Sequence, residues 1–322
     1  MASCRCCGLC LGAMAVVPLA IVLQALVEVP IVTPFAWESV SATEEVKSKR
    51  TFKDNGAGVA FGSGEMFNKI AFAYDLGNRW MSFGLDQFWR QTLINDCLKL
   101  RADDQILDLA TGTADVALLV GARLQELAAA AKGGPAVFGV DPSTEMLRIG
   151  VQKIRDVSLE NVIHLHQGDA QNLSSVASVM GEPTVLGGLE GLATGSIDKI
   201  SMSFGIRNVP DRSKALREMV RVLKKTESSR VCILEFSLPD GSTTLSKIAQ
   251  FFITQIIPFI GSVATLGKGG AEYQYLERSI VEFPSPKEFA AQMTRNGLPV
   301  RNITSFQHGS VQLYTATVKV DA

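Results

Sequence analysis

The sequence has no surplus of charge of either sign. Its 322 residues hold 31 Lys and Arg against 32 Asp and Glu, so the formal net charge is −1. Proteins that bind nucleic acid usually present a broad basic face, and this composition favours none. Histidine is scarce, with 3 residues, and no cluster of histidine, cysteine and acidic residues has the spacing of metal ligands. We therefore expect no nucleic-acid partner and no metal site.

Cysteine is too unevenly spread for a disulfide framework. Four of the 6 cysteines stand in the first ten positions, whereas Cys97 and Cys232 are single residues in apolar surroundings. The spacing of Cys4 and Cys7 suits a pair of metal ligands or a site for an acyl chain, but no second pair with ligand spacing follows. The sequence therefore predicts no disulfide framework.

Charge is missing altogether from residues 9–27, where Gln24 is the one strongly polar residue. The length of this run, about 19 residues, falls between the apolar core of a signal peptide and a membrane span. Arg5 is the only basic residue before Lys47, so the segment lacks the arginine-rich character of a mitochondrial presequence. We expect either a removed targeting segment or a retained anchor, followed by a polar linker over residues 38–64.

One stretch, residues 105–115, organises the rest of the chain. An apolar run with Asp108 near its end leads into small residues around Gly112, and a helical pattern begins after Asp115. Small residues let the backbone approach a ligand, and strand-to-helix turns at the carboxyl edge of a parallel sheet hold nucleotides. A second apolar run ends in Asp141, whose carboxylate suits two ribose hydroxyls. The pattern indicates an adenosine-type cofactor; a tight loop without a ligand is the alternative.

Apolar runs alternate with amphipathic stretches through the rest of the chain, as in a parallel α/β domain. The last two runs, 300–306 and 311–320, predict an antiparallel hairpin added to that sheet. The loop at 129–135 is long, and the longer loop at 174–195 is interpreted as a surface insertion. The predicted strands lie near residues 105–109, 136–140, 162–166, 197–203 and 230–236, and the predicted helices near 115–131, 143–155 and 211–223.

Further candidate site residues follow the third and fourth strands. Asp169, next to Ala170, either accepts a hydrogen bond from an adenine amino group or caps a turn. Arg207 and Asn208 lie in a loop at the same sheet edge. An arginine beside an apolar pocket stabilises negative charge there, and a surface ion pair is the alternative for Arg207.

Two apolar segments allow more than one interpretation. Residues 65–89 carry aromatic side chains at helical spacing, which either pack in a core or form a cap over the pocket, with Tyr74 and Asp75 at its lip. Residues 243–267 are apolar but are interrupted by Pro258, so a membrane span is not predicted. This segment either packs over the sheet edge or turns an apolar surface toward lipid or an apolar substrate.

A set of short blocks links these features to a known family. The blocks are Phe67-Asn68-Lys69-Ile70-Ala71, Tyr74-Asp75-Leu76, Ile106-Leu107-Asp108-Leu109-Ala110, Gly139-Val140-Asp141-Pro142-Ser143, Gly168-Asp169-Ala170, Ser203-Phe204-Gly205-Ile206-Arg207-Asn208-Val209, Leu234-Glu235-Phe236-Ser237, and Tyr275-Leu276 with Ser279-Ile280 and Phe283-Pro284. In them the sequence resembles the class I S-adenosylmethionine-dependent C-methyltransferases of ubiquinone and menaquinone biosynthesis, over residues 67–319. Many methyltransferases share single blocks, whereas the last three together are specific to this family.

The resemblance implies a Rossmann-like α/β fold with helices on both faces of a seven-stranded, mostly parallel sheet whose last strand is antiparallel. It implies S-adenosylmethionine as the cofactor, a targeting or anchor segment with linker at residues 1–50, and a methyltransferase domain at residues 51–322. The cofactor-binding positions that it implies are Asp108, Gly112 and Thr113 in the turn, Asp141 on the ribose, Asp169 and Ala170 near adenine, and Ser203 near the reacting end.

The sequence departs from the family pattern at three places. Thr111 and Ala114 replace glycines, so the turn has to accept a β-branched residue and a methyl group near the methionine part of the cofactor. Asp86-Gln87 stands where the family has His-Arg, which questions a substrate role at these positions. Residues 225–229 replace a Pro-Gly-Gly turn, for which we expect no functional effect.

The implied reaction transfers a methyl group to a ring carbon of a prenylated quinol, of the 2-methoxy-6-polyprenyl-1,4-benzoquinol type of ubiquinone biosynthesis. Arg207, with Asn208, is assigned to the phenolate, and Tyr74, Asp75 or a water held by Arg207 to the proton acceptor. Alternatives are a demethylmenaquinol or demethylphylloquinol ring in a plastid, another lipid or small molecule such as a sterol, and a cofactor-binding scaffold without catalysis.

The resemblance also implies partners and a location. The expected partners are the prenylated quinol, a membrane surface, and either a second copy of the chain or a quinone-biosynthesis complex. The family is expected on the matrix side of the mitochondrial inner membrane, whereas the apolar leader favours a plastid. These expectations depend on the family and on the leader, not on the residues of the predicted site.

Overall fold

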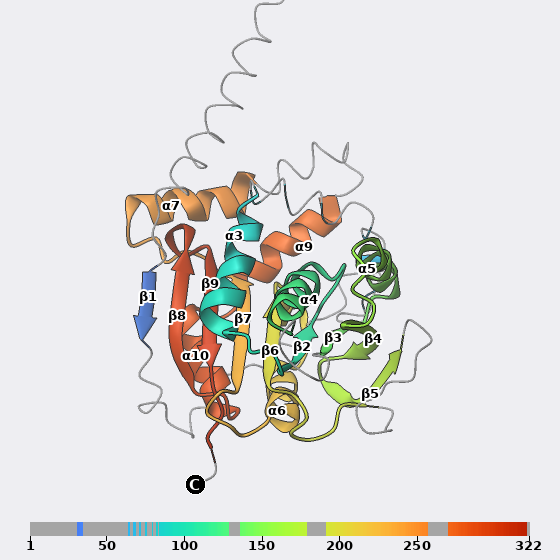
Figure 1. Cartoon of the computed structure of the whole chain (residues 1–322). Helices are drawn as coiled ribbons and strands as arrows, with labels where there is room; N and C mark the ends of the chain where they lie inside the picture. Colours follow the sequence, from blue (N-terminus) through green and yellow to red (C-terminus); the bar gives the residue numbers. More distant parts are fainter. Residues whose placement is uncertain are drawn as a thin grey trace, which may run out of the picture.

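The described part of the chain is an open sheet with helices on both faces (Figure 1). The computed structural model describes residues 31–34, 64, 67–68, 71, 75, 79, 82, 84–128, 136–178, 191–256 and 270–320. Among these residues the sheet has 9 strands, in the order β1-β8-β9-β7-β6-β2-β3-β4-β5. The strands are β1 (Ile31–Pro34), β2 (Gln105–Leu109), β3 (Ala136–Asp141), β4 (Ile163–Asp169), β5 (Asn172–Ser178), β6 (Lys199–Ser203), β7 (Arg230–Phe236), β8 (Val300–Phe306) and β9 (Val311–Ala316).

The predicted Rossmann-like architecture is confirmed in the middle of this sheet. Strands β4, β3, β2, β6 and β7 are parallel, and the strand order reverses between β2 and β6. The last strand, β9, is antiparallel to both of its neighbours and lies between β7 and β8. The predicted closing hairpin therefore forms, and its second strand joins the sheet next to β7. A ligand site is expected where the order reverses, beyond the carboxyl ends of β2 and β6.

Two short strands extend the sheet at its edges. β5 pairs antiparallel with β4, so the first residues of the predicted 174–195 insertion are strand and not loop. The prediction failed there because only Leu173 and Val176 of this strand are buried, which leaves a weak apolar pattern. At the other edge β1 pairs antiparallel with β8, although β1 lies within the predicted 1–50 segment. The predicted long loop at 129–135 lies outside the described residues.

The core has two layers, one on each face of the sheet. Alternate side chains of a strand enter opposite layers: Ile106 of β2 is buried in one, and Leu107 and Leu109 in the other. Helices α3, α4 and α5 cover the first face, and α6 and α10 the second (Figure 1). The helices are α3 (Leu85–Thr92), which continues into the π-helical turn η2 (Leu93–Leu98), α4 (Asp115–Ala128), α5 (Thr144–Asp156), α6 (Arg212–Val222), α7 (Thr244–Phe251) with η4 (Phe252–Ile256), α9 (Gly270–Val281) and α10 (Pro286–Arg295), with the short turns η3 (Ile206–Asn208) and η5 (Gln307–Gly309).

Polar side chains at the starts of the helices set their boundaries. Ser143 is the N-cap of α5, and its hydroxyl accepts from the backbone N–H of Met146 at 3.3 Å. Asp211 accepts from the N–H of Lys214 at 2.9 Å and caps α6 in the same way. Both helices therefore begin one residue after the position expected from the apolar pattern alone.

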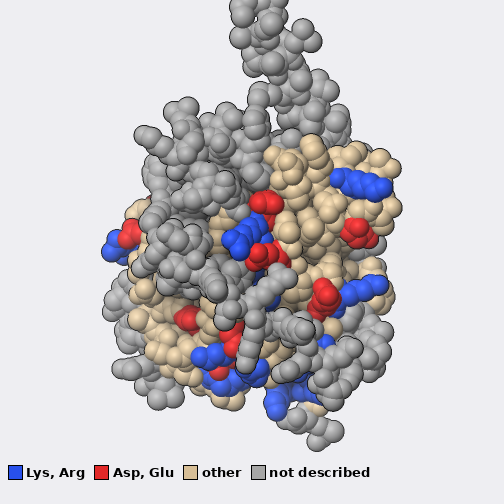
Figure 2. All heavy atoms as spheres, turned by 180° about the vertical axis from the view of Figure 1, so that it is seen from behind, with Lys and Arg blue, Asp and Glu red and all other residues tan. Residues whose placement is uncertain are grey.

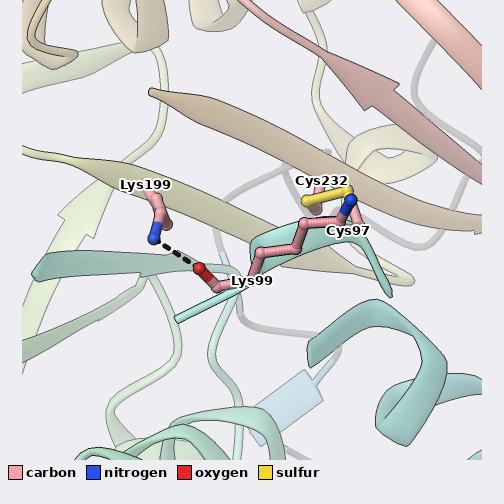
Figure 3. The surroundings of a disulfide bond; sticks show 4 residues. All are labelled: Cys97, Lys99, Lys199 and Cys232. Atoms are coloured by element: carbon pink, nitrogen blue, oxygen red, sulfur yellow. Dashed lines mark hydrogen bonds between the residues drawn. A yellow bond between two sulfur atoms is a disulfide. The ribbon is translucent and has the colours of Figure 1, made fainter. Parts of the chain in front are cut away.

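A disulfide joins the first core layer to the sheet, contrary to the prediction that the cysteines form no such framework. Cys97 of η2 and Cys232 of β7 are both buried and are bonded across 135 residues of sequence (Figure 3). Nearby, the Nζ atom of Lys199 donates to the backbone carbonyl of Lys99 at 2.8 Å and forms an ion pair with Asp104. The end of η2 is thus fixed to β7 covalently and to β6 by a buried cation.

The surface of the described residues carries both signs of charge. On the face drawn in Figure 2, basic and acidic side chains lie beside one another. Ion pairs such as Lys224–Asp198, at 2.7 Å, join neighbouring elements. The described helices include none that is long and apolar enough to cross a membrane.

Candidate active site

A cavity opens where the strand order reverses. It contains about 710 Å³ of non-atom space, part of which is open solvent. Its described lining comes from the residues that follow β2, β3, β4 and β6, with Gly64 and Phe67 from the N-terminal side. The lining residues are Gly64, Phe67, Ala110, Gly112, Val140, Asp141, Pro142, Met146, Gly168, Asp169, Ala170, Met202, Ser203, Phe204, Gly205, Asn208, Val209 and Pro210.

Asp108 supports the turn after β2 from below and does not line the cavity. It is buried, and its carboxylate accepts from the hydroxyls of Thr111 and Ser201, each at 2.7 Å. Burial raises the pKa of Asp108 to about 6, although both hydroxyl donors act in the opposite direction. The threonine that replaces a family glycine at position 111 is therefore a hydrogen-bond partner of Asp108, which explains how the turn accepts it.

Asp141 stands at the end of β3 and lines the cavity. Oδ2 accepts from the N–H of Gly112 at 2.9 Å, and Oδ1 from the N–H of Ser143 at 2.8 Å. Burial raises the pKa of Asp141 to about 6, and these two N–H donors act against that shift. Each oxygen keeps further lone pairs, so the carboxylate has the capacity for two hydroxyl donors.

Asp169 and Ala170 lie at the end of β4, on the cavity wall, as predicted from their position in the sequence. The carboxylate of Asp169 accepts from the backbone N–H of Gln171 at 2.8 Å and from its side-chain amide at 2.9 Å. Asp169 is exposed, so its oxygens stay accessible to a ligand. The structure thus combines the two alternatives for Asp169, a turn cap and a cavity carboxylate, without testing its contact with adenine.

The turn after β6 brings Ser203 and Asn208 to the opposite wall. Phe204 has a φ of 57°, a conformation that side chains rarely adopt. At Gly205 an added Cβ would lie 2.4 Å from the Cβ of Ala110, so this turn packs directly on the turn after β2. The Oγ of Ser203 is buried and has no hydrogen-bond partner among the described residues. A buried hydroxyl without a partner at a cavity wall points to a ligand that supplies one.

Arg207 lies beneath this turn and is not among the described lining residues. Its Nη1 donates to Glu235 Oε1 at 2.6 Å and to the carbonyl of Phe204 at 2.7 Å, and its Nε donates to the Ser279 hydroxyl at 3.3 Å. Its own backbone N–H donates to Glu235 Oε2 at 3.1 Å. The guanidinium is thus committed to a buried ion pair that holds η3 in place, and its direct contact with a phenolate stays a prediction.

Asn208 faces the cavity and is held from behind by α9. The phenol hydroxyl of Tyr275 donates to Asn208 Oδ1 at 2.9 Å. Burial raises the pKa of Tyr275 above its usual range, so the phenol keeps its proton at neutral pH. Sequence reasoning quoted Tyr275 only as part of a family block, because nothing local shows that α9 returns to the loop after β6.

Asp75 and Thr113 are joined to Lys153 at the rim, and none of the three is a described lining residue. The Thr113 hydroxyl donates to Asp75 Oδ1 at 2.7 Å, while Lys153 Nζ lies 2.6 Å from Asp75 Oδ2 and 3.1 Å from the Thr113 hydroxyl. Lys153 also pairs with Asp115 at 2.8 Å. Both oxygens of Asp75 are therefore engaged, and its predicted role as a proton acceptor stays untested. Tyr74 lies outside the described residues.

Asp86, where the sequence departs from the family pattern, has hydrogen-bond partners in the structure. Asp86 is buried in α3, where its carboxylate accepts from the Ser82 hydroxyl at 3.0 Å and from Arg90 Nη1 at 2.7 Å. Arg90 in turn pairs with Asp115 at 2.9 Å, which connects α3 to the start of α4. The acid at position 86 is thus part of a charge network between helices, which sequence reasoning missed because its members are distant in the chain.

The residues present fit an adenosine-type donor. The cavity offers a carboxylate with spare acceptor capacity at Asp141 and a buried hydroxyl without a partner at Ser203. These two groups lie on opposite sides of the strand-order reversal, the position where open α/β sheets bind nucleotides. Of the predicted cofactor residues, Gly112, Asp141, Asp169, Ala170 and Ser203 line the cavity, whereas Asp108 and Thr113 lie behind it.

Comparison with known proteins agrees with this geometry. The model of the ubiE/COQ5 methyltransferase family matches residues 57–318. The chain belongs to this family. It is an S-adenosylmethionine-dependent methyltransferase, as the sequence blocks implied, and the cavity at the strand-order reversal is its candidate donor site.

The chain aligns with nearly the whole length of curated relatives from this family. The chain is 37% identical over 254 residues to the ubiquinone/menaquinone biosynthesis C-methyltransferase UbiE of Geotalea daltonii, which covers 79% of the chain and 93% of the relative. It is 32% identical over 254 residues to UbiE of Campylobacter jejuni, with 78% and 95% covered. Among solved structures, a SAM-dependent methyltransferase from Aquifex aeolicus has a TM-score of 0.48 at 16% identity, covering 78% of this chain and 98% of that one.

Proposed function

We propose that this methyltransferase C-methylates the ring of a prenylated quinol, of the 2-methoxy-6-polyprenyl-1,4-benzoquinol type of ubiquinone biosynthesis. The observation that carries the proposal is the β6 wall of the cavity, where the amide of Asn208 lies between apolar groups. A ring oxygen needs a hydrogen-bond donor when it loses its proton, and the ring itself needs an apolar surface. Phe67, Phe204 and Val209 supply that surface.

In this proposal the chain binds and orients the donor and the quinol, and it stabilises the charge that develops during transfer. Asp141 accepts from the two ribose hydroxyls, Asp169 and Ala170 border the adenine, and Ser203 donates near the reacting end. S-adenosylmethionine supplies a methyl group that is activated by the positive charge on sulfur. The quinol hydroxyl gives its proton to a base, for which Tyr74, Asp75 and a water held by Arg207 are the candidates, and Asn208 donates to the oxygen as its negative charge develops, which makes the neighbouring ring carbon nucleophilic. After methyl transfer that carbon releases its hydrogen as a proton to the same base or to solvent, which restores the aromatic ring. Arg207, through its pair with Glu235, keeps Asn208 and the carbonyl of Phe204 in place.

A demethylmenaquinol or demethylphylloquinol of a plastid is the second candidate substrate. The names of the curated relatives join ubiquinone and menaquinone biosynthesis, so both ring types belong to the proposal. The test is methyl transfer from deuterium-labelled S-adenosylmethionine to three acceptors: a 2-methoxy-6-prenyl-1,4-benzoquinol with a short prenyl chain, a demethylnaphthoquinol and a sterol. Mass spectrometry of the products identifies the preferred ring. Labelled sterol without labelled quinol would contradict the proposal, and donor binding without any product would favour a scaffold.

We place the enzyme at a membrane surface, where prenylated quinols reside. Leu245, Ile248 and Phe251 recur every three residues along α7 and are 36%, 53% and 59% exposed. Such a stripe suits contact with lipid, with a second copy of the chain or with a quinone-biosynthesis complex. Sedimentation with liposomes that contain anionic lipid tests the first, and mass photometry the second. Imaging residues 1–60 fused to a fluorescent protein distinguishes the mitochondrial inner membrane from a plastid.

A further inference from the structure

One face of α9 makes hydrogen bonds to two residues of the turn after β6, Arg207 and Asn208. Tyr275 and Ser279 are four residues apart, so their side chains lie on the same side of the helix. Tyr275 donates to Asn208 Oδ1 at 2.9 Å, and Ser279 accepts from Arg207 Nε at 3.3 Å. α9 therefore supports η3. Through Tyr275 it contacts Asn208, the residue of η3 whose amide side chain lines the cavity.

The contact engages the oxygen end of the Asn208 amide and leaves the NH2 end available. A side-chain amide has an acceptor oxygen and a donor NH2 group on opposite branches. Since the phenol proton of Tyr275 goes to Oδ1, the NH2 group is turned away from Tyr275. Among the described residues this NH2 group has no hydrogen-bond partner. Because Asn208 lines the cavity, a donor without a protein partner thus belongs to a residue of the cavity wall.

We propose that Tyr275 is a positioning residue for methyl transfer, because it orients the Asn208 amide so that the NH2 group, and not the carbonyl oxygen, meets the quinol oxygen. The inference rests on the proposed function and adds a requirement to it. A reversed amide would point its carbonyl lone pairs at a developing phenolate and oppose the reaction. Tyr275 itself touches no reacting atom in this proposal.

The chain offers a matched control for the loss of a buried phenol hydroxyl. Tyr314 of β9 is also buried, and its hydroxyl has no hydrogen-bond partner among the described residues. Tyr314 packs in the second core layer, against Phe289, at a ring-centroid distance of 5.0 Å. Tyr314→Phe therefore removes the same atom as Tyr275→Phe but breaks no hydrogen bond to the turn after β6.

The test compares turnover, donor binding and stability in the full chain. Tyr275→Phe should lower kcat about tenfold, the effect of one lost hydrogen bond, and leave the donor Kd and the unfolding midpoint unchanged. Tyr314→Phe should leave kcat unchanged. Asn208→Ala should lower kcat about a hundredfold, and the double variant Tyr275→Phe with Asn208→Ala should be no slower than Asn208→Ala alone. Asn208→Asp, which keeps the acceptor for Tyr275 but removes the donor, should be slower than Asn208→Ala.

A spectroscopic measurement separates this inference from the proposed function. The side-chain NH2 resonances of Asn208, assigned by their loss in Asn208→Ala, should shift or broaden in Tyr275→Phe. In Tyr314→Phe their positions and widths should be unchanged. Unchanged resonances, a kcat within twofold of the wild type, or multiplicative losses in the double variant would each overturn the positioning role. If the wild type binds the donor but methylates no quinol, the proposed function fails, and the Asn208 resonances alone decide whether Tyr275 fixes the amide.

Discussion

The buried disulfide makes a quantitative prediction about stability. The bond between Cys97 and Cys232 closes a loop of 135 residues. In the chain-entropy model a loop of this length restricts the unfolded chain by about 5 kcal/mol, and native disulfides contribute about 2 to 5 kcal/mol when they are removed. Reduction, or replacement of both residues by alanine, should therefore lower the unfolding free energy by an amount in this range.

The assay is guanidinium unfolding of the full chain with and without reductant, followed by intrinsic fluorescence. Loss of the bond should lower the midpoint and raise the dependence of the free energy on denaturant, because the unfolded chain expands and exposes more surface. The double alanine variant should respond to reductant no further, which makes it the internal control. Turnover below the unfolding range should not change, since neither sulfur lines the cavity described by the structure.

Peptide mapping decides whether the bond exists in the protein. Alkylation in denaturant before reduction marks free thiols, and a second label after reduction marks those released from a disulfide. The peptides of Cys97 and Cys232 should carry the second label. If both carry the first label, or if reduction shifts neither the midpoint nor its slope, the disulfide and the stability derived from it are refuted.

Three further predictions concern charged residues in and behind the cavity wall. Because burial raises the pKa of Asp141 to about 6, the protonated carboxyl stabilises the fold at low pH, and this stability is lost as pH rises from about 4 to 6. The affinity for the donor should increase over the same pH range. In calorimetry, Asp141→Asn should bind the donor at least tenfold more weakly and with less pH dependence. Arg207→Ala leaves Glu235 buried and unpaired and should cost about 3 to 5 kcal/mol of unfolding free energy as well as turnover, with thermal melts and kcat as readouts; full stability would contradict the buried pair. Lys153→Met removes the cation that pairs with Asp75 and should raise the donor KM severalfold, whereas Lys153→Arg should retain most of the affinity. Equal KM values for the wild type and both variants would contradict a role of this ion pair in donor binding.

The parallel part of the sheet could be predicted because its signals are local. β2 and β7 begin and end at the predicted residues, since continuous apolar runs with polar ends define buried strands. β5 could not, because its strand character depends on pairing with β4 and only a minority of its side chains are buried. The Cys97–Cys232 bond escaped for the same reason: it joins elements whose proximity no periodicity encodes.

The candidate site shows the same division between local and distant information. The positions of Asp141, Asp169, Ser203 and Asn208 at the carboxyl ends of strands follow from where each apolar run stops. The partners do not follow, because Glu235 is 28 residues from Arg207 and Tyr275 is 67 residues from Asn208. Sequence reasoning therefore left Arg207 either beside the pocket or in a surface ion pair, whereas the fold pairs it with a buried anion.

The pairing of these charges suits the electrostatics of methyl transfer from a sulfonium. A free guanidinium beside the reacting end would stabilise a phenolate but would also repel the positive sulfur of the donor. In the structure the charge of Arg207 is compensated by Glu235, and that of Lys153 by Asp75 and Asp115. Within the described lining, Ser203 and Asn208 offer neutral hydrogen-bond donors. For the quinol that we propose as substrate, a neutral amide would stabilise the phenolate without opposing the donor, and on that proposal the orientation of Asn208 matters more than the charge behind it.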